Sequence, residues 1–167
     1  MSFRINNNMI IEYNRQKAVD YALKWALTYN PDYYKFTDIG GDCTNYISQC
    51  LLHGDAKMNY NKTEGWYYIN ASNRSPSWTS VFYLQKFLLE NKTLGPFGHI
   101  TRISQVQPGD IIQIRQNPFR FNHSVIVTRV ENGEIYVCAH THNVKNKKLS
   151  SYNFLQLLAI HIDGIYL

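Results

Sequence analysis

Apolar side chains recur every three or four positions at three places in the first half of the chain, which is the period of an amphipathic helix. The first stretch, Asn14 to Tyr29, is stopped by Asn30-Pro31. The second follows Gly40-Gly41-Asp42 and ends before Gly54, and the third follows Ser75-Pro76-Ser77. The sequence therefore predicts three helices before residue 95, each with one face turned toward a core.

Beyond Pro108-Gly109-Asp110 the pattern changes to runs of β-branched and alternating residues. The predicted strands are Ile111–Arg115, Ser124–Val130, Ile135–His140 and Ala159–Tyr166. The middle two are joined across Asn132-Gly133, a strong signal for a tight hairpin. Helices first and antiparallel strands afterwards indicate an α+β domain, with N-terminal helices packed on a C-terminal antiparallel sheet.

Composition bounds the class of protein. With 167 residues, 44% hydrophobic and 17% charged, the chain is expected to fold as a single domain over residues 12–167. No apolar run approaches the ~20 residues of a membrane span. Residues 1–11 form an N-terminal extension without the apolar stretch of an export signal. The expected location is cytoplasmic for the chain as it stands, and secreted or wall-associated if it is part of a longer protein.

The net charge of +5 is modest, and the densest basic run, Lys145-Asn146-Lys147-Lys148, is interpreted as a solvated loop. We therefore expect no nucleic-acid partner and no membrane partner, and a monomeric protein. A mildly basic surface would suit acidic polymers such as cell-wall glycans.

The three cysteines form no C-x-x-C pair, which indicates free thiols rather than a disulfide framework. Cys50 and Cys138 lie on apolar stripes and are expected to be small buried hydrophobes. Cys43 follows Asp42, whose carboxylate is expected to cap the second helix. In the first helical turn, the helix dipole and free backbone amides would lower the pKa of the Cys43 thiol and could receive an oxyanion. Cys43 is therefore the candidate nucleophile.

A candidate base lies downstream at the mouth of an apolar strand. His123 begins one arm of the predicted hairpin and His140 ends the other, so the two side chains are expected to lie nearly opposite each other. His140 could then orient His123 as the third member of a triad. His142 and Asn143 are rivals for that role, but both fall in the following loop, which favours His140.

These residues carry a resemblance to a known family. The chain resembles the amidase domain family of clostridial and bacillar proteins, related to NlpC-like and CHAP-like papain-fold cysteine peptidases. The matching blocks, in family order, are residues 13–22, Gly40–Leu51, Ser77-Trp78-Thr79, Pro108–Ile112, His123–Val127 and Ala139-His140-Thr141. The resemblance implies a papain-like fold without cofactor or metal. It also implies Cys43 as nucleophile, His123 as base, His140 as orienting residue, and hydrolysis of an amide in a peptide or peptidoglycan-type substrate.

The chain departs from papain-type enzymes just before the cysteine, where Phe36-Thr37-Asp38 replaces their glutamine. Oxyanion donors would then be backbone amides beside Asp42, with Tyr33 or Tyr34 as a further donor; the sequence does not say which tyrosine points inward. Trp78 could line a substrate groove or serve as a core aromatic.

Other classes of function compete with amide hydrolysis. An acyltransferase would use the same cysteine, and a non-catalytic binding module would keep the groove alone. A metal site would use Cys50-x-x-His53 and His140-x-His142. It is disfavoured because Cys50 belongs to a buried stripe and no second paired spacing exists.

Overall fold

The computed structural model describes residues 9–167, so the predicted extension lies mostly outside the described residues. The helices are α1 Arg15–Trp25, α2 Cys43–His53, α3 Pro76–Thr79 and α4 Val81–Glu90, with 3-10 turns at Ile103–Gln105 and Leu149–Ser151. The strands are β1 Ile10–Ile11, β2 Tyr68–Asn70, β3 Asn73–Arg74, β4 Gly95–Thr101, β5 Ile111–Arg115, β6 His123–Glu131, β7 Glu134–Ala139, β8 Val144–Lys148 and β9 Gln156–Tyr166.

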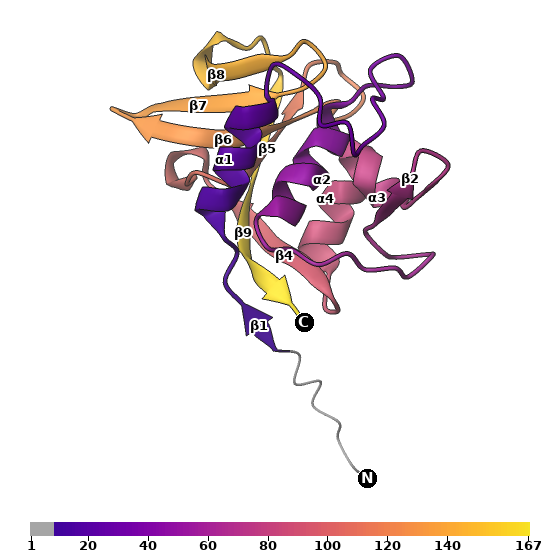
Figure 1. Cartoon of the computed structure of the whole chain (residues 1–167). Coiled ribbons are helices and arrows are strands. Elements are labelled where there is room, and N and C mark those ends of the chain that lie inside the picture. The colour runs from indigo at the N-terminus through magenta and orange to yellow at the C-terminus, as the bar shows by residue number, and fades with distance from the viewer. Residues whose placement is uncertain (1–8) are drawn as a thin grey trace.

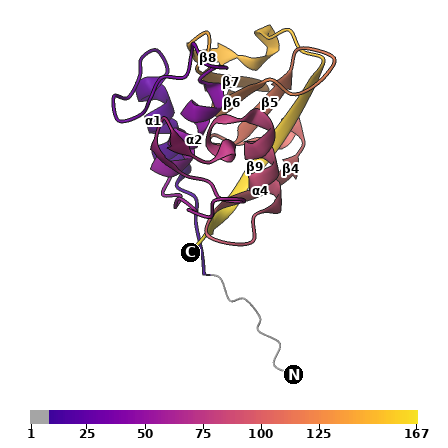
Figure 2. The same cartoon turned by 90° about the vertical axis from the view of Figure 1, so that its right-hand side faces the viewer.

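An antiparallel, seven-stranded sheet forms one layer, in the order β1-β9-β5-β6-β7-β8 with β4 also paired to β9 (Figure 1). The helices form a second layer over one face of it, and Figure 2 shows the two layers from the side. The described chain ends meet where the N–H of Leu167 donates to the carbonyl of Met9 at 2.8 Å. The predicted α+β class with an antiparallel sheet is confirmed.

The sheet buries apolar side chains on both faces. Ile126 of β6 and Cys138 of β7 pack toward α1, α2 and α4 in one core cluster. Val125 and Val127 belong to a second cluster on the opposite face, which Leu149 helps to cover. Successive residues of a strand point to opposite faces of the sheet. Ile126 of β6 therefore faces the helices, whereas Val125 and Val127 face away from them.

Two predicted helices differ in extent. The first ends at Trp25 rather than Tyr29, since the Trp25 carbonyl accepts from Thr28 and from the ring of His140. The third is divided into α3 and α4 at Ser80, whose backbone is extended and whose hydroxyl caps α4 by accepting from the N–H of Tyr83 at 3.4 Å. The second helix begins and ends as predicted, with Gly54 at its C-cap.

All four predicted strands are present, with ends shifted by no more than three residues. In the hairpin between β6 and β7, Asn132 and Gly133 both have positive φ, 50° and 77°, as the turn signal predicted. No helix in the described part of the chain is both long and apolar enough to cross a membrane.

Candidate functional site

The turn that leads into α2 is built on Gly40 and Gly41. Both have positive φ, 82° and 102°, which side chains with a Cβ rarely adopt. A Cβ on Gly41 would also come within 3.2 Å of Thr141 Oγ1, in the turn after β7. The two glycines let the chain reverse closely enough to begin α2 at Cys43, so the predicted place of Cys43 in the first helical turn is confirmed.

The Cys43 thiol is surrounded by hydrogen-bond donors but is nearly closed to solvent, with the residue 8% exposed. Sγ lies 3.8 Å from Thr44 Oγ1 and also accepts from the backbone N–H groups of Ser124 and Thr44. Burial nevertheless raises the pKa of the thiol, and the nearby Asp42 carboxylate adds to that effect. The predicted lowering of this pKa is therefore wrong, because burial outweighs the donors.

The Asp42 carboxylate does not cap α2, contrary to the prediction. Its Oδ1 accepts from the backbone N–H of Phe36 at 2.8 Å and from Asn45 Nδ2 at 2.9 Å. Its Oδ2 lies 2.6 Å from His140 Nδ1. The Asp42 N–H donates to Thr141 Oγ1 at 2.7 Å. Since Asp42 is 1% exposed, these partners compensate the burial of its charge and tie the end of β7 to the start of α2.

His140 is held on every side. Its Nε2 lies 2.8 Å from the Trp25 carbonyl, and its Nδ1 is bound to Asp42. Its ring stacks on Tyr46, with centroids 4.1 Å apart, and contacts Tyr29 at 4.7 Å. Both ring nitrogens are therefore engaged by partners within the fold. No ring nitrogen is left to orient His123.

The sheet register explains why His140 does not meet His123, as had been expected. A register shift lies in the hairpin, and beyond it Ile126 pairs with Cys138. Extending this pairing places Ser124 opposite His140. Cross-strand partners share a face and the next residue takes the other, so a one-residue difference assigns His140 and His123 to opposite faces.

His123 is the first residue of β6 and is 8% exposed. Its ring lies 6.0 Å from that of Tyr152, centroid to centroid. Burial and, to a smaller extent, the nearby His142 and Lys147 together lower the pKa of His123 to about 4. The imidazole is thus neutral at neutral pH and able to accept a proton.

The link between Cys43 and His123 in the described part of the chain runs through Ser124. The thiol accepts the N–H of Ser124, the residue directly after His123, and Ser124 Oγ lies 3.3 Å from Thr44 Oγ1. In the described part of the chain, no direct hydrogen bond joins Sγ to the imidazole. The thiol therefore has a backbone N–H donor on the residue next to His123, while the His123 side chain shares the face of Val125 and Val127 on β6.

The remaining predicted site residues, Trp78, Tyr33 and Tyr34, have different surroundings in the structure. Trp78 is fully buried and donates from Nε1 to Asn45 Oδ1 at 2.9 Å, so it is a core aromatic and lines no groove. Tyr33 packs inward, stacked on Trp78 at 6.1 Å, and burial raises its pKa to about 12. Tyr34 is 45% exposed. Within the described residues, neither tyrosine forms a hydrogen bond with Cys43.

The residues of the alternative metal site do not form a cluster of ligands in the described part of the chain. Cys50 is fully buried in the core, and His53 stacks on the Tyr21 ring at 4.0 Å. Across residues 9–167, no three His, Cys, Asp or Glu side chains are grouped as a ligand set. Cys50 and Cys138 are confirmed as buried free cysteines.

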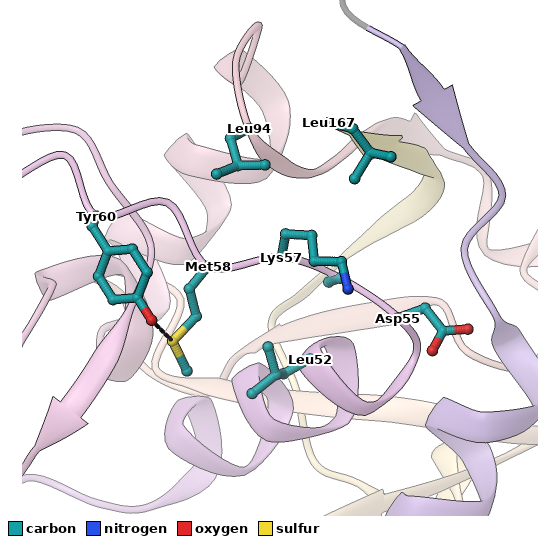
Figure 3. Close-up of a pocket in the computed structure, with 8 residues that line it drawn as sticks. Leu52, Asp55, Lys57, Met58, Tyr60, Leu94 and Leu167 are labelled. Atoms are coloured by element: carbon teal, nitrogen blue, oxygen red, sulfur yellow. Dashed lines mark hydrogen bonds between the residues drawn. The ribbon is translucent and has the colours of Figure 1, made fainter.

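A cavity of about 760 Å³ lies at the opposite end of α2 from Cys43. Figure 3 shows the side chains of Leu52, Leu94 and Leu167 around it, with the Tyr60 hydroxyl donating to Met58 Sδ at 3.4 Å. It is an open, mainly apolar hollow whose lining contains no Cys, Ser, Thr or His, so Cys43 remains the candidate nucleophile.

Sequence reasoning missed the residues that couple the site to its surroundings. The sequence does not indicate that Ser124 and Thr44 contact each other, and it favours a solvated loop for Lys147, which lies in β8. The adjacency of Ser124 to His123 was the one available signal. The contact between Asp42 and His140 spans 98 positions and has no local signature.

Comparison with known proteins agrees with the class of domain. The family described as "Putative amidase domain" matches residues 12–162, and the chain belongs to this family. Its description indicates amide hydrolysis. No solved structure matches the chain, so the expected relation to NlpC-like and CHAP-like proteins gains no support from structure.

Two relatives come from Bacillus subtilis (strain 168). The chain is 35% identical over 127 residues to the uncharacterized protein YhbB, covering 74% of this chain and 40% of YhbB. It is 28% identical over 142 residues to the uncharacterized protein YjcM, covering 80% of this chain and 32% of YjcM. The chain therefore spans less than half the length of these relatives.

Proposed function

We propose that this domain is a cysteine-dependent amide hydrolase with a papain-like division of roles, acting on a peptide such as a cell-wall peptide. Cys43 is the nucleophile and His123 the base. The observation that carries the proposal is the position of the thiol: it lies at the amino end of α2 and accepts the N–H of Ser124, next to His123.

The reaction starts from neutral partners, because burial raises the pKa of Cys43 and lowers that of His123 to about 4. The imidazole accepts the S–H proton as sulfur attacks the carbonyl carbon. The negative charge on the carbonyl oxygen develops beside the free N–H groups in the first turn of α2. The amine then leaves with the proton from His123, and water hydrolyses the thioester.

In this proposal His140 is a positioning residue and does not touch the substrate. Its hydrogen bonds to Asp42 and to the Trp25 carbonyl hold the turn from which Cys43 emerges. A loosened turn would misplace the sulfur, and misplacement of about 1 Å can cost ~100-fold in rate. Loss of His140 therefore acts through geometry.

The test is turnover of defined peptides, including purified cell-wall peptides, followed by mass spectrometry. Cys43→Ala and His123→Ala should each lower the rate by about 10²- to 10⁴-fold or more. Cys138→Ala is the matched control, since Cys138 is fully buried in the core and the same atom is removed.

The outcomes separate the competing functions. Turnover retained by Cys43→Ala would place the nucleophile elsewhere. An acyl adduct on Cys43 that is released by added amines and not by water would identify an acyltransferase. Absence of both turnover and adduct across the peptides would favour a binding module.

A further inference from the structure

A polar side chain is buried in the middle of an otherwise apolar strand. Gln113 of β5 is fully buried and stands between Ile112 and Ile114. It pairs with Ser124 of β6, and cross-strand partners share a face, which here is the face covered by the helices. Within the described chain, Gln113 Oε1 has no hydrogen-bond partner. An apolar side chain would avoid burying this unpaired oxygen, so stability alone does not explain the glutamine.

The amide nitrogen of Gln113 has two acceptors. Its Nε2 donates to the carbonyl of Val81, the first residue of α4, at 2.8 Å. It also donates to Ser124 Oγ at 3.5 Å. A carbonyl only accepts hydrogen bonds, so the nitrogen of the amide, and not its oxygen, must face Val81. The orientation of the Gln113 amide is therefore fixed by the start of α4.

Two hydroxyl groups connect Gln113 to the sulfur of Cys43. Ser124 Oγ lies 3.3 Å from Thr44 Oγ1, and Thr44 Oγ1 lies 3.8 Å from Cys43 Sγ. Thr44 is 1% exposed and Ser124 is fully buried, so bulk water does not compete for these contacts. The four side chains thus form one continuous chain of polar groups across β5, β6 and α2.

The direction of the hydrogen bonds in this chain follows from Gln113. Ser124 Oγ accepts from the amide nitrogen, so its single hydrogen is left for Thr44 Oγ1. Thr44 Oγ1 then accepts from Ser124, and its own hydrogen is left for the sulfur. The chain presents a donor to Sγ before any charge develops there, and consecutive hydrogen bonds strengthen one another.

We propose that Gln113 is a positioning residue for Cys43: its amide aligns two hydroxyl groups so that the chain ends in a donor at the sulfur. This inference rests on the proposed function, in which the sulfur becomes negatively charged as its proton passes to the base. The chain stabilises that charge and transfers no proton itself. The charged group that acts on the thiol, the Asp42 carboxylate, disfavours the same charge, so a fixed donor counteracts it.

The test is the pH dependence of Cys43 alkylation by iodoacetamide in the intact chain, followed by mass spectrometry. The thiolate displaces iodide and forms a thioether, so the midpoint of the rate profile reports the pKa of the thiol. Gln113→Met removes the amide and Thr44→Val removes one hydroxyl, and each should move the midpoint to higher pH. The rate below the midpoint should fall by about 3- to 10-fold, whereas the rates above it should agree within about 2-fold.

Gln49→Met is the matched control. Gln49 is a buried glutamine of α2 whose Oε1 accepts from the Tyr21 hydroxyl of α1 at 2.7 Å, so the same substitution is made outside the chain of donors. It should leave the midpoint unchanged. Thr44→Ser keeps the hydroxyl and should retain the native midpoint, whatever it does to the free energy of unfolding. If Gln113→Met does not fold, Ser124→Ala breaks the same chain by removing one oxygen and should shift the midpoint alike.

The outcomes separate this inference from the proposed function. Native midpoints in Gln113→Met and Ser124→Ala would overturn the role of Gln113, even if Thr44→Val were shifted. An equal shift in Gln49→Met, or a Thr44→Ser protein that behaves like Thr44→Val, would show a general effect of packing instead of a donor chain. The expected shifts in a protein that hydrolyses no amide would support the chain and overturn the proposed function alone. A native Cys43 that iodoacetamide does not reach at any pH would overturn both.

Discussion

The end of β7 and the start of β6 each carry a buried histidine, and the two are held differently. His140 is 1% exposed, with both ring nitrogens bound and its ring between two tyrosines. His123 is 8% exposed, and among the described residues its ring forms no hydrogen bond. A histidine whose nitrogens are satisfied by the fold serves stability, whereas one left without protein partners is available for chemistry.

The largest effect that tests this comparison is on the free energy of unfolding. His140→Ala leaves the buried Asp42 carboxylate without the partner of its Oδ2, which should cost about 3–5 kcal/mol. His123→Ala removes no hydrogen bond and should cost about 1 kcal/mol, the median for a point mutation. Denaturant unfolding of both variants measures the difference. Equal losses would show that His140 is not the structural member of the pair.

The sequence predicted the elements but not the partnership between Asp42 and His140. Glycines and periodicity located α2, and Asn132-Gly133 located the hairpin. The edge strand β8 was missed because its residues, Val144–Lys148, are mostly polar and have no apolar alternation. The face of His140 was assigned wrongly because a register shift between β6 and β7 leaves no mark in the pattern of residues.

The second prediction concerns stability in acid. The free energy of unfolding should fall by about 3 kcal/mol at most, because each pKa unit corresponds to about 1.4 kcal/mol. The folded pKa of His123 is lowered from 6.5 to about 4. Between these values the unfolded chain binds the proton more strongly, so stability falls as pH falls through this window. Above this pH range, the titration of His123 should not change the free energy of unfolding. Unfolding free energies measured across the range give the slope.

The control for that slope is His123→Gln, which cannot titrate. The difference between the two proteins should grow as pH is lowered through the window and be constant above it. A slope that persists in His123→Gln would mean that another group, rather than the unpartnered histidine, produces the acid sensitivity.

The smallest predicted effect concerns the turn after β7, which joins the end of that strand to the start of α2. Thr141 Oγ1 accepts the buried N–H of Asp42 at 2.7 Å, and Thr141→Val keeps the shape but removes the acceptor. An unsatisfied buried N–H should cost about 1–2 kcal/mol, measured by unfolding. Thr141→Ser keeps the oxygen and should cost less than about 1 kcal/mol. Because the same hydrogen bond holds the turn before Cys43, Thr141→Val should also slow iodoacetamide labelling of Cys43, whereas Thr141→Ser should not. If serine and valine were equally destabilising, the methyl packing of Thr141, and not its hydrogen bond, would join the two regions.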